Sequence, residues 1–88
     1  MSDATKKILR EIDEERARQI AKGWTPEHDD DHEDGMIAVH AAAAIDPYNT
    51  TPWLTPWTRR ADLIRGIALA VAEVERLDRL SAKEPTHD

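Results

Sequence analysis

The segment from Gly23 to Gly35, which reads GWTPEHDDDHEDG, most constrains how this chain can fold. Gly23 predicts the end of a preceding helix, because glycine readily adopts the left-handed conformation that follows a helix C-terminus. Thr25 and Pro26 then predict the start of another helix, with Thr as N-cap and Pro at the first helical position. The same segment gathers carboxylates and two histidines, which are groups that bind metal ions. It is therefore both a helix junction and a candidate site.

The residues before this junction predict one helix. Ser2 or Asp3 can cap it, and neither Pro nor Gly interrupts the chain until Gly23. At 100° per residue, Ile8 and Ile12 define its apolar face. We expect this face to pack against the rest of the domain.

Two polar residues, Glu15 and Gln19, fall on the centre of that apolar face. A carboxylate that points toward a core must be paired, protonated or bound to a metal ion. Glu15 can therefore pair with an arginine such as Arg16 or Arg18, or it can belong to a binding site. The sequence leaves both interpretations open.

A second helix is expected from about Pro26 to Ile45. Gly35 weakens its middle, so its first turns could instead form a loop or a 3₁₀ turn. The run of alanines at 41–44 would allow another helix to approach closely, and Asp46-Pro47 ends the helix.

The third and longest helix is expected from about Pro56 to Leu80. Its main apolar stripe contains Leu63, Ile64, Ile67, Val71 and Val74, while Leu69 and Leu80 lie on the opposite side. A helix that is apolar on two sides is either central in the fold or part of an interface between copies. The sequence thus predicts a small all-α bundle of three helices, or four with a short extra turn, as a single domain over residues 1–80. Residues 81–88 are expected to form a disordered tail.

A Trp- and Pro-rich connection joins the second and third helices, with TPWL at 51–54 and TPWT at 55–58. Trp53, Trp57 and Trp24 could cover the open end of a small core, since the chain has no Phe. Alternatively, one of these rings could stack on a base or another flat ligand.

Composition narrows the classes of function. A chain of 88 residues buries only about 60% of its unfolded surface, which favours association into a homo-oligomer. The formal charge of −6 argues against broad nucleic-acid binding, which needs clustered Lys and Arg. Cysteine is absent and no apolar run is long enough to cross a membrane. We expect a soluble, cytoplasmic protein without membrane contact.

The most concrete candidate site is a divalent-metal site formed by Glu15, Asp29, His32 and Glu33. Hard ions such as Mg²⁺ favour carboxylate oxygens and keep water molecules that bind phosphates. Arg59 and Arg60, at the start of the third helix, could clamp those phosphates. The ligand-binding set predicted here is completed by Gln19, Trp24 and Trp57.

A zinc site is the alternative for the same segment. It would use His28 and His32, four residues apart, together with a carboxylate or His40. His40 could equally be a histidine packed against the alanine-rich helix.

One pair of motifs resembles the MazG-like all-α nucleoside triphosphate pyrophosphatases, in which Glu-x-x-Glu and Glu-x-x-Asp hold magnesium. The matching segments are Glu11–Glu14 and Glu27–Asp30. Glu14 lies opposite the apolar face of its helix, however, and Glu27 lies at a helix start. We therefore prefer Glu15 to Glu14 as a ligand.

Several further segments resemble a recurrent group of short, uncharacterised proteins of bacteriophages and prophages. They are ERARQ at 15–19, GWTPEHDD at 23–30, the alanines at 41–43 and AEVERLDR at 72–79. The resemblance implies a phage accessory protein, and it supplies no catalytic residues.

Two functions follow as expectations. The first is binding of a nucleotide or similar phosphorylated small molecule, with Mg²⁺ and with hydrolysis left open. The second is inhibition of a host defence complex, in the manner of an anti-CRISPR or a signal-sequestering protein, through an acidic protein-protein surface.

Overall fold

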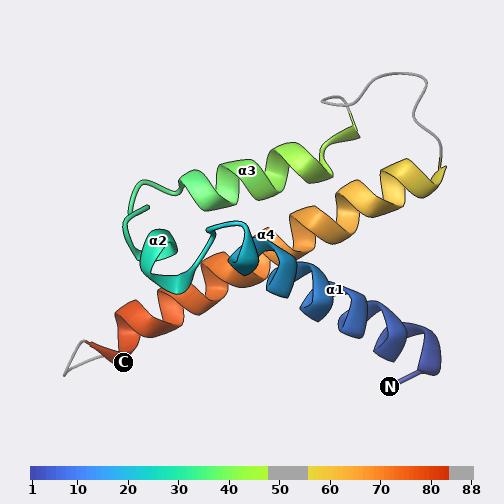
Figure 1. The fold of residues 1–88 in the computed structure, drawn as a ribbon, viewed down its shortest axis with the longest axis horizontal. Coiled ribbons are helices and arrows are strands. Elements are labelled where there is room, and N and C mark those ends of the chain that lie inside the picture. Colours follow the sequence, from blue (N-terminus) through green and yellow to red (C-terminus); the bar gives the residue numbers. More distant parts are fainter. Residues whose placement is uncertain (48–55, 84–88) are drawn as a thin grey trace.

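The computed structural model describes residues 1–47 and 56–83, which form four helices and no strand (Figure 1). These helices are α1 (Asp3–Ala21), α2 (Pro26–Asp30), α3 (Met36–Ile45) and α4 (Pro56–Ala82). The predicted all-α fold with one short extra helix is confirmed. The connection at 48–55, including Trp53, and the end of the expected tail at 84–88 lie outside the described residues.

Helix α4 is the centre of the described fold. It packs against α1, α2 and α3, and each of these three contacts α4 more than it contacts the others. Figure 1 shows α3 alongside α4 and running in the opposite direction, while α1 meets α4 with its C-terminal half. The first ten residues of the chain are exposed and project away from the bundle.

The predicted helix ends are confirmed at the first junction. The Ser2 hydroxyl accepts a hydrogen bond from the backbone N–H of Thr5 at 3.1 Å and caps α1. Gly23 follows the other end of α1 with φ of 113°, a conformation that side chains disfavour. The Thr25 hydroxyl then accepts from the backbone N–H of His28 at 3.2 Å and caps α2. Local capping rules therefore place both ends of this junction.

The expectation of one continuous helix from Pro26 to Ile45 is wrong. Helix α2 ends at Asp30, and α3 begins only at Met36. Gly35, with φ of 79°, is the N-cap of α3, and a residue in that conformation cannot lie inside a helix. The Asp34 carboxylate accepts from the backbone N–H of Met36 at 3.1 Å, which supplies the cap that glycine lacks.

The buried side of α4 differs from the predicted stripe. Val74 is 57% exposed, and the other four members of the stripe are only half-buried. Instead, Ala68, Leu69 and Ala72 are buried. The small side chains allow α3 to approach α4 closely. The buried face of α4 is therefore the one that α3 can approach, and not the one with the largest apolar residues.

The alanine-rich face of α3 confirms the predicted close packing. Ala41 and Ala44 are buried, and Gly66 of α4 lies against them. Trp57, in contrast, is 73% exposed, so the prediction that it covers the core is wrong. Helix α4 also extends two residues beyond its predicted end at Leu80. Among the residues that the model describes, no helix has the length and apolarity of a membrane span.

The close approach at Gly66 gives a prediction for Gly66→Ala. Alanine normally stabilises a helix interior by about 1 kcal/mol over glycine. Here the added Cβ would lie 2.6 Å from Cγ1 of Ile45 and 3.0 Å from the carbonyl oxygen of Ala41. We expect the free energy of unfolding, measured by chemical denaturation, to fall by about 1–3 kcal/mol because of overpacking. A variant more stable than the wild type would show that α3 does not hold this position.

Candidate functional site

A buried ion pair between Arg16 and Asp29 organises the region of the candidate sites. Arg16 of α1 is 6% exposed, and Asp29 of α2 is completely buried. The Nη2 group of Arg16 donates to Oδ2 of Asp29 at 2.7 Å, a short, charge-assisted bond. Arg16 also donates from Nη1 to the carbonyl oxygen of Trp24 at 3.0 Å. The guanidinium therefore fixes the junction between α1 and α2 from inside.

The four predicted metal ligands do not share a single cluster of contacts. Asp29 pairs with Arg16, and Glu15 accepts a 2.8 Å bond from Nε of Arg18. His32 faces His28, and Glu33 is exposed. No group of three or more His, Cys, Asp or Glu in the described part of the chain has the arrangement that holds a metal ion. Mg²⁺ binding by this set stays a prediction.

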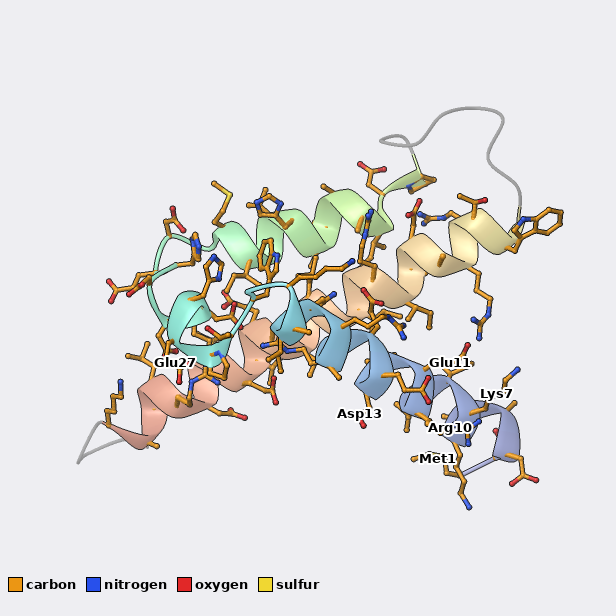
Figure 2. The ribbon with its side chains drawn as sticks, viewed as in Figure 1. Met1, Lys7, Arg10, Glu11, Asp13 and Glu27 are labelled. Atoms are coloured by element: carbon orange, nitrogen blue, oxygen red, sulfur yellow. The ribbon has the colours of Figure 1, made fainter. Side chains whose placement is uncertain are left out.

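The two predicted phosphate clamps bond to other parts of the protein. Arg59 donates to the carbonyl oxygens of Ala44 and Ile45 and so satisfies the C-terminal end of α3. Arg60 forms two bonds to the Glu11 carboxylate, at 2.9 and 2.6 Å. Figure 2 shows Glu11 on the side of α1 that faces α4.

The bonds to Arg60 lower the pKa of the Glu11 carboxyl, and the bonds to Glu11 raise the pKa of Arg60. Arg79 has the same relation to Asp30, where its hydrogen bond, 2.9 Å from Nη2 to Oδ1, lowers the pKa of the Asp30 carboxyl. This second pair ties α2 to the C-terminal part of α4. Glu11 and Asp30, two acids of the segments that resemble the pyrophosphatase motifs, are thus held as carboxylates by arginines of α4.

A groove of about 400 Å³ lies between α3 and α4 in the described surface. We call it the Trp24 groove, and its lining residues are Trp24, His40, Ala43, Ala44, Arg65 and Leu69. An adjoining hollow of about 180 Å³ shares Trp24, Arg65 and Leu69 with it and adds residues from α1 and its C-terminus, namely Glu15, Gln19 and Lys22. A half-buried indole, an amide and two cationic side chains therefore meet at one place.

Gln19 has an unsatisfied group at this place. Its side chain is buried, with 6% exposure, and Nε2 donates to the carbonyl oxygen of Arg65 at 3.2 Å and to Oε2 of Glu15 at 3.5 Å. Both partners are acceptors, which fixes the orientation of the amide. The buried Oε1 then has no hydrogen-bond partner among the described residues. A buried acceptor without a donor costs about 1–3 kcal/mol, so a ligand donor there would be favourable.

The structure thus brings together two of the five predicted ligand-binding residues, Gln19 and Trp24. Arg59, Arg60 and Trp57 are not among the residues that line the groove. Sequence reasoning missed Arg65 and Lys22. Arg65 precedes Gly66, the position of closest approach to α3, and this neighbourhood is the signal that could have indicated it.

A cluster of aromatic and imidazole rings forms the other side of Trp24. The indole packs edge-on against His28 and His40, with ring centroids 5.1 and 5.7 Å apart. His28 in turn contacts His32, with Nε2 of each ring 3.3 Å from the other. A hollow of about 160 Å³ lies among these rings. Trp24 therefore separates a groove with cationic groups from a cluster of histidines.

Comparison with protein-family models, curated proteins and solved structures finds no match to this chain.

The buried ion pair predicts non-additive effects of substitution. Asp29→Leu leaves the buried Arg16 with only a longer, 3.5 Å contact to the exposed Glu75, and Arg16→Met leaves Asp29 buried without its arginine. Each single change should lower the free energy of unfolding by about 3–5 kcal/mol, because a buried charge without a partner is strongly destabilising. The double variant should be more stable than either single variant, since it removes both charges. Denaturation of the three variants followed by circular dichroism tests this, and simple addition of the two losses would contradict the coupling.

Proposed function

We propose that the Trp24 groove binds a nucleotide or a similar phosphorylated small molecule with a flat ring. The unpaired, buried Oε1 of Gln19 beside Trp24 carries the proposal. It supplies an acceptor for a ring N–H, in a hollow that an aromatic residue and two cationic side chains also line. The aromatic residue matches the face of a nucleotide base, the acceptor matches the edge of the base, and the cationic side chains match the phosphate.

Trp24 would provide the stacking surface. Its ring is half-buried and lines both hollows, and the edge-on contacts with His28 and His40 hold it in place. Stacking of a base on such a ring contributes about 1–3 kcal/mol and tolerates any base. Selection among bases would then come from the Gln19 amide, which accepts only from a ring that presents a donor.

Arg65 and Lys22 would hold the phosphate. The Arg65 side chain is 55% exposed, and its ion pair with Asp62 of the same helix, 3.4 Å long, is of the exposed type that contributes little. Lys22 is exposed at the C-terminal end of α1. Glu15 lines the adjoining hollow, but Arg18 at 2.8 Å offsets its charge. The cationic groups therefore act locally in a protein of net charge −6.

Isothermal titration with a panel of nucleoside mono-, di- and triphosphates tests this function. We expect at least one member to bind, and Arg65→Ala to weaken that binding about tenfold or more, because charge-assisted hydrogen bonds contribute about 1.5–3 kcal/mol. Arg10→Ala is the matched control, since Arg10 is an exposed arginine of α1 outside the groove. Titrations with and without Mg²⁺, followed by a phosphate-release assay, test the metal and hydrolysis separately. No heat from any member, or equal loss in both variants, would contradict the proposal.

A second function, inhibition of a host defence complex, is favoured by the exposed acids around α2. Asp29 and Asp30 are paired with arginines, but Glu27, Asp31, Glu33 and Asp34 are exposed. Figure 2 shows Glu27 on α2, in the part of the molecule away from the N-terminus. Such a surface would dock on a basic surface of a partner protein, as expected from electrostatic complementarity.

This second function predicts a charge-dependent protein complex. A variant with the four exposed acids changed to their amides should keep its helix content by circular dichroism, because these side chains are exposed. Affinity capture from a phage host should recover a basic protein with the wild type and not with the variant. Recovery of no partner, or of the same proteins with both, would argue against inhibition through this surface.

A further inference from the structure

We infer that His28 and His32 form a two-histidine binding site for a transition-metal ion of the zinc type. Their two Nε2 atoms lie 3.3 Å apart. Two nitrogens bound at about 2.0–2.1 Å to one tetrahedral ion lie about 3.3–3.4 Å from each other. The observed separation is therefore the one that two ligands of a single zinc ion require.

The two rings approach each other by their Nε2 corners. Their centroids are 4.6 Å apart, which is further than the two Nε2 atoms, and the ring planes are inclined by 54°. Rings that lay side by side would have equal separations of centroids and nitrogens. The Nε2 corners thus converge, as they must if both lone pairs are to reach one ion.

Asp29 prepares His28 for this role. Nδ1 of His28 lies 3.4 Å from Oδ1 of Asp29, whose other oxygen is held by Arg16. In the tautomer that donates from Nδ1 to this carboxylate, Nε2 presents its lone pair to an ion. A carboxylate bonded to the second nitrogen of a histidine is the usual support of a metal-binding imidazole. The completely buried Asp29 therefore orients the His28 ring and does not bind the ion itself.

The surroundings leave room for the rest of the coordination shell. A hollow of about 160 Å³ lies beside the pair, lined also by Trp24, Met36, Ile37 and His40. The His28 side chain is 40% exposed, so an ion and water molecules can reach it. Water would complete the tetrahedron, since no third His, Cys, Asp or Glu in the described residues joins the pair. Imidazole nitrogens favour Zn²⁺, Cu²⁺ or Ni²⁺ over Mg²⁺, which separates this site from the predicted carboxylate site.

This site does not depend on the proposed nucleotide function. It lies at the hollow lined by His28 and His32, whereas Gln19, Lys22 and Arg65 line a different hollow. His40 lines both the groove and the histidine hollow. Arg10, an exposed residue of α1 that lines neither of them, serves as the control residue.

Titration of the full chain with ZnCl₂ by calorimetry tests the inference. We expect one ion per chain, and a loss of more than about 100-fold in affinity in His28→Gln and in His32→Gln, since even supporting residues behind a metal ligand are worth 10–100-fold. The control variant Arg10→Ala should bind zinc as the wild type does, because Arg10 is exposed and lies outside the hollow. Circular dichroism of each variant checks that the helices are retained, which the partial exposure of both rings favours.

A second measurement does not rely on substitutions. In ¹H–¹⁵N spectra of the histidine rings of the wild type, zinc should shift Nε2 of His28 and of His32 more than the ring nitrogens of His40. Absence of zinc binding would overturn the inference, and so would zinc shifts confined to other histidines or equal loss in Arg10→Ala. Nucleotide titration of His32→Gln keeps the two functions distinguishable, because His32 lines neither hollow of the nucleotide site and its described ring contact is with His28, so loss of zinc binding should leave nucleotide binding in place.

Discussion

The buried bond between Arg16 and Asp29 is the interaction on which both candidate sites depend. Removing two charges from water is costly, and the pair is retained only because its geometry is short and its remaining atoms find partners. Those partners are the carbonyl oxygen of Trp24, Oε1 of Glu75 and Nδ1 of His28. One guanidinium and one carboxylate thus position the indole of the groove and the first ring of the histidine pair. The position of each site is a consequence of how this single pair is satisfied.

The rest of the fold is built around close backbone contact rather than bulky side chains. The buried apolar residues of α3 and α4 are mainly alanines, with Ile37 and Leu69 as the large members. An alanine interface buries little area per residue, so its stability comes from the close approach that Gly66 permits. The large apolar side chains that this leaves outside include Val39, Val74, Leu77 and Leu80. They are consistent with the predicted association between copies, which stays a prediction.

The sequence was most informative where structure is decided locally. Ser2, Thr25 and Gly23 identify their helix ends because each acts within one turn of the backbone. The apolar periodicity of α4 predicted the wrong buried face because it emphasises large apolar side chains. Helix α3 instead packs against the face of α4 where the side chains are small. The role of Arg16 could not be predicted, since its partner Asp29 lies across a junction whose path the sequence does not define. Arg65 was missed because its place at the groove depends on how α4 packs against the other helices, which the sequence does not define. Gln19 was identified because a polar residue on the apolar face of its helix is unexpected.

Trp24 is a common wall between two hollows of different chemistry. A ligand stacked on one face of the indole and an ion bound beside the rings at its edge would share one side chain, so displacement of that ring would alter both. Thermodynamic linkage then requires reciprocity: any factor by which zinc changes nucleotide affinity must equal the factor by which the nucleotide changes zinc affinity. Through this one side chain, the domain would couple the binding of two different ligands. The coupling would be positive if both ligands favour the same orientation of the indole, and negative if they favour different ones.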